Sequence, residues 1–211
     1  MTVQIVPPGQ ALPGDADLVL LPGTKTTIAD LAQLRAEGWD IDLMAHHRRG
    51  GRILGICGGY QMLGREVIDA DGLEGPPGAV PGLGFLDVTT RMQPAKRVRV
   101  SAARHDASGL PVSGYEIHLG ETTGPDCARS WLTLDGRPEG AASVDGLVQG
   151  CYLHGLFGGD GFRNWYLQSL GAAASDFAHG PSVETALDAL AAHLERYMDI
   201  DAVLALAAEP G

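Results

Sequence analysis

The sequence predicts an α/β protein with a mostly parallel, doubly wound sheet, flanking helices and a second half that is richer in strands. Three observations lead to this class. Short apolar runs alternate with helical patterns over the first part of the chain, which is typical of parallel sheets. The 30 glycines and 13 prolines among 211 residues indicate many tight turns. Strand-like stretches then dominate the middle of the chain.

Two short apolar runs near the N-terminus, Val3–Val6 and Asp17–Leu21, each stop at a proline and predict strands. The second run is continuous, so we expect it to be buried on both faces. A helix is expected at Thr26–Glu37, where apolar residues recur every three positions after threonines that can cap its start. Gly38 closes this segment, so the order is strand, turn and helix.

The next segments repeat this order. Asp40–Arg49 predicts a second helix, and Gly51–Ile56 predicts a strand. Cys57, Gly58 and Gly59 follow that strand directly, and a helical pattern begins after them at Tyr60–Ile68. Two successive units of this kind indicate parallel neighbours in one sheet.

The second half has a different pattern. Residues 69–84 hold several prolines and glycines and predict an irregular connection. Strand-like stretches follow at Phe85–Thr89, Arg97–Ala103, Tyr115–Leu119 and Leu147–Leu153. Helices are expected at Phe162–Leu170 and Val183–Met198, and the acidic end from Gly171 onward predicts a solvated face. We expect residues 1–211 to form a single domain.

The net charge and the cysteines limit the classes of partner and of metal or disulfide site that the chain is expected to have. Lys and Arg total 15 against 26 Asp and Glu, a formal net charge of −11. This charge argues against nucleic acid or an anionic membrane as the main partner. Cys57, Cys127 and Cys151 are odd in number and widely spaced, which fits neither a disulfide framework nor a zinc site. We therefore expect reduced thiols, a cytoplasmic protein without a secretion signal, and no metal ion or cofactor in this chain.

Cys57 is the strongest candidate for chemistry. It lies between a predicted buried strand and a predicted helix, with glycine on both sides, and this arrangement forces a tight turn that presents a nucleophile. A helix N-terminus favours the thiolate, and the glycines allow a substrate carbonyl to approach backbone N–H groups. A buried structural cysteine would not need these glycines. We interpret Cys57 as a nucleophile, and Cys127 and Cys151 as packing or surface residues.

A thiolate that attacks an amide needs a base and an acid, and histidine suits both roles. His154 ends a predicted strand and precedes Gly155, which places it where parallel sheets bind their ligands. His118 is a second possibility, but it shares a strand face with Glu116, which favours a satisfied pair or a substrate contact there. The other histidines are predicted on the surface: His46, His47, His105, His179 and His193.

Four motifs in order carry a family resemblance. They read LLPGTKTTIADL at 20–31, LGICGGYQMLG at 54–64, GYEIHLG at 114–120 and YLHGLF at 152–157. Together they resemble the glutamine amidotransferase domain of cobyric acid synthases, a CobQ-type, class I-like glutaminase. The resemblance runs from the first residues to the predicted helix at Phe162–Leu170 and is less clear through the acidic end.

The resemblance implies an enzyme of the ligase class that hydrolyses glutamine. Cys57 would attack the side-chain carboxamide to give a γ-glutamyl thioester and ammonia, and His154 would move the protons. The backbone N–H groups of Gly23 and Gly58 would bind the oxyanion, and donors of this kind contribute about 2.7–4 kcal/mol each. Gln61 would contact the substrate glutamine by analogy with related amidotransferases.

The sequence differs from the wider class I pattern at one position and from the full-length family at its start. Leu156 stands where many class I enzymes have a glutamate that orients the histidine, so a Cys–His dyad is expected, oriented by another group. The sequence has no P-loop motif, and the domain's own first strand looks absent. We therefore expect a fragment completed by an ATP-dependent synthetase domain or subunit, which would hold the ATP, the magnesium and the corrinoid substrate.

The resemblance then implies a place in cobalamin biosynthesis, where the ammonia would serve the amidation of corrinoid carboxylates. One alternative is the glutaminase subunit of a complex that amidates cell-wall precursors, which shares the Cys-Gly-Gly-Tyr-Gln turn. A further alternative is a non-catalytic interaction module of the same fold. The presence of both Cys57 and His154 argues against the module.

Overall fold

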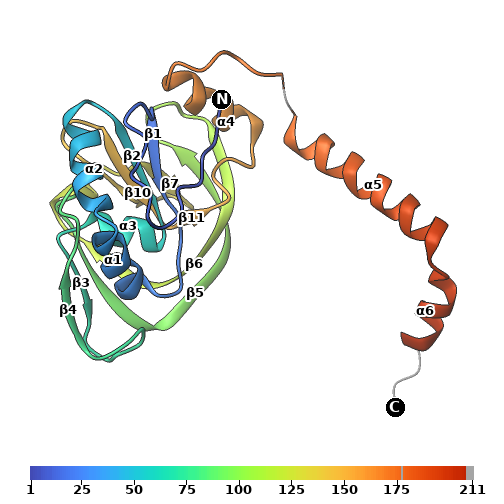
Figure 1. Cartoon of the computed structure of the whole chain (residues 1–211), viewed down its shortest axis with the longest axis horizontal. Helices are drawn as coiled ribbons and strands as arrows, with labels where there is room; N and C mark the ends of the chain where they lie inside the picture. Colours follow the sequence, from blue (N-terminus) through green and yellow to red (C-terminus); the bar gives the residue numbers. More distant parts are fainter. Residues whose placement is uncertain (177, 208–211) are drawn as a thin grey trace. The chain divides into compact units, whose positions relative to one another are not determined.

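The computed structural model describes residues 1–176 and 178–207, and it divides the chain into two compact units. The first unit, Met1–Ala174, holds two β-sheets and four α-helices, and the second begins at Ser175 and holds two helices (Figure 1). The mixed α/β class expected from the sequence is confirmed.

The first sheet has four strands in the order β1-β2-β10-β9. Its first three strands run parallel, and β9 is antiparallel to β10. The strands are β1 (Leu18–Leu21), β2 (Arg52–Ile56), β9 (Ala141–Ala142) and β10 (Val148–Cys151). The helices that follow β1 and β2 are α1 (Thr27–Ala36), α2 (Trp39–Arg48) and α3 (Gly58–Leu63). This confirms the two predicted strand-turn-helix units.

The second sheet has seven strands and is mostly antiparallel, with one parallel pair between β3 and β5. Its main path is β11-β6-β5-β3-β4, and β7 joins it through β5. The strands are β3 (Glu66–Asp69), β4 (Gly78–Pro81), β5 (Thr89–His105), β6 (Pro111–Thr123), β7 (Leu132–Leu134), β8 (Arg137–Glu139) and β11 (Leu153–His154). A short 3-10 helix, η1 (Pro125–Ala128), follows β6. Tyr152 alone separates β10 in one sheet from β11 in the other.

The first sheet is covered on both faces, because neighbouring residues of β2 point into different cores. Ile53 packs into a core with Leu31, Leu43 and Leu63 from the helices α1 to α3. Leu54 packs into a second core that holds aromatic residues of α4 (Asp160–Ser169) and apolar residues of β7. Burial on both faces fixes the position of β2, and so of the residues that follow its end.

The second unit contains α5 (His179–Tyr197) and α6 (Ile200–Ala207). Their described residues are almost all exposed, including Val183, Leu187 and Leu190. The helix expected at Val183–Met198 is confirmed. Among the described helices, none combines the length and the apolar character that crossing a lipid bilayer requires.

Three predictions near the N-terminus are wrong in detail. Val3–Val6 is not a strand, because it pairs with no strand and leaves Val3 and Ile5 exposed. The strand β1 is not buried on both faces, because it lies at the edge of its sheet and Leu20 is 39% exposed. Thr26 does not cap α1 with its side chain; its hydroxyl bonds Asp30 instead.

Several boundaries in the middle of the chain also differ from the prediction. The helix after Cys57 ends at Leu63, and residues 66–69 form β3. The connection 69–84 contains β4, which pairs with β3. Residues 85–88 are irregular, because Leu86 and Val88 pack against the end of α3, where their backbone bonds Leu63 and Arg65. The strand predicted at Leu147–Leu153 is split between the two sheets.

Candidate active site

Cys57 occupies a strained turn between β2 and α3. Its backbone has φ 52° and ψ −111°, a positive φ that a residue with a side chain rarely adopts and that costs about 1–3 kcal/mol. The close packing of the flanking glycines holds this turn in place. A Cβ on Gly59 would lie 2.1 Å from the backbone oxygen of Leu21, so α3 can approach β1 only with glycine there. The tight turn predicted from the sequence is confirmed.

Cys57, His154 and Gly23 meet at the ends of strands from both sheets. Cys57 follows β2, Gly23 follows β1, and His154 ends β11. A Cβ on Gly23 would lie 2.9 Å from His154 Cε1 and 3.4 Å from Cys57 Cβ. The structure therefore brings together three of the five residues predicted for the site, and a larger residue at position 23 would displace the imidazole.

The imidazole of His154 is oriented by β6, which pairs with β11. Tyr115 lies directly opposite His154 in the register and stacks on it, with ring centroids 5.0 Å apart and planes 5° from parallel. The Ile117 carbonyl accepts a hydrogen bond from the ring. The other ring nitrogen, Nε2, is buried and has no hydrogen-bond partner among the described residues. Leu156 is buried in the core and takes no part in this orientation.

Tyr115 and Ile117 are the orienting groups that sequence reasoning missed. Both belong to the motif GYEIHLG, so the motif was visible, but its pairing with the strand that carries His154 was not. Gly114 permits this pairing, because a Cβ there would lie 2.0 Å from the His154 backbone oxygen.

Burial shifts the ionisation of both candidate catalytic groups toward the neutral form. Desolvation raises the pKa of Cys57, with a smaller rise from the charge of Glu74 and an opposing hydrogen bond from the Gly58 backbone. The same physical cause lowers the pKa of His154, opposed by its bond to Ile117. The expected preference for a thiolate at the helix N-terminus is thus opposed in the resting site, where loss of solvent raises the pKa of the thiol. A thiol beside a neutral imidazole needs that imidazole as a base.

The other two predicted site residues lie beside Cys57. The backbone of Gly58 forms a hydrogen bond with the Cys57 sulfur. Gly58 therefore lies next to the nucleophile, where a donor to the oxyanion is expected. Gln61 is buried; its Oε1 accepts from the Thr27 hydroxyl at 3.0 Å, and its Nε2 donates to the Tyr152 hydroxyl at 3.3 Å. An amide has two hydrogens and two lone pairs, so each end of Gln61 has one more hydrogen or lone pair than these two bonds use.

Three of the other histidines, His46, His105 and His118, are buried. His118 is buried, stacks on Tyr152 with centroids 3.7 Å apart, and lies 3.7 Å from Glu116 through Nε2. His46 and His105 are buried, so their prediction as surface residues is wrong. His46 bonds the Arg52 carbonyl at 2.9 Å, and His105 packs among aromatic rings beside Trp131.

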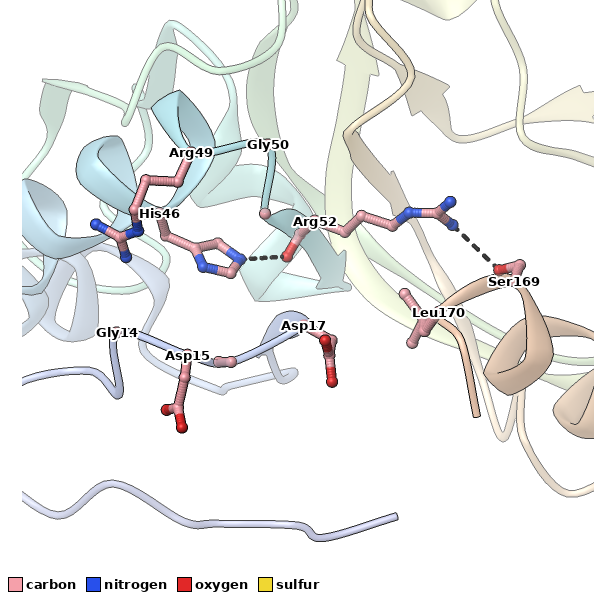
Figure 2. Close-up of a pocket in the computed structure, with 11 residues that line it drawn as sticks. Gly14, Asp15, Asp17, His46, Arg49, Gly50, Arg52, Ser169 and Leu170 are labelled. Atoms are coloured by element: carbon pink, nitrogen blue, oxygen red, sulfur yellow. Dashed lines mark hydrogen bonds between the residues drawn. The ribbon is translucent and has the colours of Figure 1, made fainter. Parts of the chain in front are cut away.

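A pocket of about 380 Å³ lies at the opposite end of β1 and β2. Figure 2 shows Asp15, Asp17, Arg49 and Arg52 around it, with the Arg52 guanidinium bonded to Ser169. None of the predicted site residues lines this pocket. Within the described part of the chain, no three His, Cys, Asp or Glu side chains gather as ligands for a metal ion.

Comparison with known families matches residues 1–162 to the CobB/CobQ-like glutamine amidotransferase domain. The chain belongs to this family. It is therefore an enzyme of the glutamine amidotransferase type, as the four motifs predicted. Two solved structures agree in fold: a glutamine amidotransferase with a TM-score of 0.51 at 16% identity, covering 73% of this chain and 78% of that one, and PurLQS from Thermotoga maritima with a TM-score of 0.53 at 18% identity, covering 71% and 73%.

Curated relatives in this amidotransferase family are much closer in sequence. Proteins named cobyric acid synthase are 64% identical in Cereibacter sphaeroides and 63% identical in Ruegeria sp., each over 98% of this chain. A third, from Paracoccus denitrificans, is 60% identical over 97% of this chain. The chain spans only 42–43% of the length of these relatives.

Proposed function

We propose that this chain hydrolyses glutamine at Cys57 and supplies the ammonia for an ATP-dependent amidation. One observation carries the proposal: Cys57 is held in a strained turn while His154 and Gly23 approach the same point in space. A strained residue persists only where the surrounding structure holds it, and such positions cluster at active sites.

The first half of the proposed reaction is acylation of the thiol. Cys57 Sγ attacks the carboxamide carbon of glutamine while its proton passes to the neutral imidazole of His154. The oxyanion that forms is bound by the N–H groups of Gly58 and Gly23. The imidazolium then gives its proton to the departing nitrogen, and the C–N bond breaks. Ammonia is released, and a γ-glutamyl thioester remains on Cys57.

The second half is hydrolysis of the thioester. Water attacks the acyl carbon as His154 takes one of its protons, and the C–S bond breaks to release glutamate. The imidazolium returns its proton to the departing sulfur, which restores the thiol and the neutral imidazole. One histidine thus serves as base and acid in both halves, and the pKa lowered by burial keeps it ready as a base near neutral pH.

In this proposal the ammonia acceptor is a carboxylate of a corrinoid in cobyric acid synthesis, within cobalamin biosynthesis. The support is the name cobyric acid synthase carried by relatives 60–64% identical over 97–98% of this chain; it favours the corrinoid over a cell-wall precursor. ATP, magnesium and the corrinoid would act at an ATP-dependent synthetase domain or subunit. We place the reaction in the cytoplasm because all three cysteines are free thiols.

The test measures ammonia release from glutamine by the chain, alone and with the synthetase part of a relative. Cys57→Ala and His154→Ala should each lower the rate by at least about a thousandfold, because the nucleophile and its base act as one unit. A glutamine analogue with an electrophilic side chain should label Cys57 and spare Cys127 and Cys151. Release that survives Cys57→Ala would contradict the proposal.

A further inference from the structure

The chain passes from one sheet to the other at Tyr152, two residues before His154, and a buried carboxylate holds this crossing. Glu139, the last residue of β8, accepts the backbone N–H of Tyr152 at 2.9 Å. Since Tyr152 alone separates β10 from β11, the crossing has no spare residue that could absorb a shift. The bond to Glu139 therefore helps to set where β11 begins, and so where His154 lies.

A second buried carboxylate belongs to the strand that pairs with β11. Glu116 lies on β6, opposite Leu153 in the register of β6 with β11. The exposed fraction is 1% for Glu116 and 7% for Glu139. Each of the two residues that precede His154 is therefore next to a buried glutamate, on β8 or on β6.

One guanidinium joins these two carboxylates. Arg137, the first residue of β8, donates from Nη2 to both oxygens of Glu116, at 2.6 and 2.7 Å, and from Nη1 to Oε2 of Glu139 at 3.1 Å. Glu139 thus bonds the Tyr152 backbone with one oxygen and the arginine with the other. Bonds between an arginine fork and carboxylates fix direction as well as distance. Arg137 therefore ties β8 to β6 at the crossing.

Stability alone does not explain this buried arrangement of charges. Burial raises the pKa of Glu139, against the opposing effects of the Tyr152 N–H and of the Arg137 charge. Replacement of a buried ion pair by apolar residues of the same volume is often neutral for stability, because the loss of solvent offsets the attraction. What the charged bonds add is one defined geometry, and it lies next to the histidine whose place decides the reaction.

We propose that Arg137 is a positioning residue for the glutaminase reaction. By joining two buried carboxylates it fixes the crossing at Tyr152, and so the distance of the His154 imidazole from the Cys57 sulfur. The inference rests on the proposed function, because it concerns the place of the base in that reaction. A displacement of about 1 Å can cost about a hundredfold in rate. The Tyr115 ring sets the rotation of the imidazole, and Arg137 sets the position of the backbone that carries it.

The first experiment compares two Arg→Lys variants of the full chain, each with the synthetase part of a relative. Arg137→Lys keeps the positive charge but loses the fork, so one ammonium group cannot hold both carboxylates in the same geometry. We expect kcat for ammonia release to fall about tenfold with KM within about twofold, because the change moves the base and not the groups that bind substrate. Arg99→Lys, in an exposed ion pair with Asp135 on the same sheet, should leave both unchanged. An unchanged kcat in Arg137→Lys would overturn the proposal.

A double-mutant cycle separates the positioning of His154 from a general disturbance of the site. The measured quantity is the rate at which iodoacetamide alkylates Cys57 near neutral pH, followed by the mass of the peptide that holds Cys57. With His154 present, Arg137→Lys should slow this alkylation at least about fivefold, because the thiol, whose pKa is raised, depends on the imidazole as a base. In His154→Ala, Arg137→Lys should change the rate by less than about twofold, because no imidazole remains to be placed. No slowing in the first background, or equal slowing in both, would overturn the proposal.

Two variants of Glu139 cover the case in which Arg137→Lys does not fold. Glu139→Gln keeps an oxygen that can accept the Tyr152 N–H, whereas Glu139→Leu removes it. The kcat of Glu139→Leu should be at least about tenfold below that of Glu139→Gln, with similar KM values, and equal kcat values would overturn the proposal. Absence of glutamine hydrolysis by the unsubstituted chain and the synthetase part would instead contradict the proposed function, while the alkylation cycle would still decide the role of Arg137.

Discussion

The two halves of the candidate site are built by different means. The Cys57 half is made of backbone: a strand buried on both faces, a residue at φ 52°, and glycines whose missing side chains let α3 approach β1. The His154 half is made of contacts: a stacked Tyr115 ring and an Ile117 carbonyl on a neighbouring strand. The first half belongs to the parallel sheet and the second to the mostly antiparallel one.

The difference shows which part of a site tolerates substitution. A backbone turn fails as a whole when one atom is added, because the obstructing atoms belong to the main chain and cannot rotate away. An imidazole held by a ring and a carbonyl keeps a partial orientation when one of the two is lost. We therefore expect large effects in the Cys57 half and graded effects in the His154 half.

The largest effect is expected from Gly59→Ala. The added Cβ would lie 2.1 Å from the Leu21 backbone oxygen, so α3 must move away from β1 and carry Cys57 with it. We expect a loss of about 3 kcal/mol in the free energy of unfolding and at least a hundredfold loss of kcat/KM. Urea unfolding and ammonia release measure the two quantities.

The matched control is Gly161→Ala in α4. A Cβ at Gly161 meets no atom within 4 Å, and alanine is a better helix former than glycine. This variant should retain both stability and activity. Equal behaviour of the two alanine variants would contradict the view that the Cys57 half depends on close backbone packing.

This contrast also explains what the sequence could predict. The glycines around Cys57 are adjacent in the chain, so the turn, the nucleophile and the helix that follows were all predicted from local letters. His154 was predicted from its place at the end of an apolar run. Its meeting with Gly23 and Cys57 required the parallel order of β1, β2 and β10, which the alternation of strands and helices indicated.

What the sequence could not predict depends on pairing between distant segments. Tyr115 faces His154 only because of the register of β6 with β11. Likewise, Arg137 reaches Glu116 only because β8 joins the second sheet through β7. The exposure of Leu20 follows from the place of β1 at the sheet edge, which an apolar run cannot reveal. Long-range register, more than local propensity, separates the confirmed predictions from the wrong ones.

A smaller, graded effect is expected from Tyr115→Leu. Loss of the stacked ring frees the imidazole to rotate, and aromatic pairs of this kind contribute about 0.5–1.5 kcal/mol. We expect kcat/KM to fall about two- to tenfold through kcat, with no change in the urea midpoint, because Tyr115 is 47% exposed. Tyr115→Phe keeps the stack and should restore the rate. If kcat/KM of Tyr115→Phe is as low as that of Tyr115→Leu, then the Tyr115 hydroxyl, and not the stacked ring, supports the role of His154.

The smallest expected effect is a shift in the pH profile, and it probes the same stack. Burial lowers the pKa of His154 below its ordinary value of 6.5, so the imidazole stays neutral, and able to accept the thiol proton, to a lower pH than a solvated histidine would. The acidic limb of kcat/KM should therefore have its midpoint below pH 6.5. In Tyr115→Leu the ring gains contact with water, so its pKa rises and the limb moves toward 6.5, whereas Tyr115→Phe leaves it in place. A midpoint of the acidic limb above pH 6.5 in the unsubstituted chain would mean that the site stabilises the imidazolium. The Cys57 thiol, whose own pKa is raised, would then lack the neutral base that it requires.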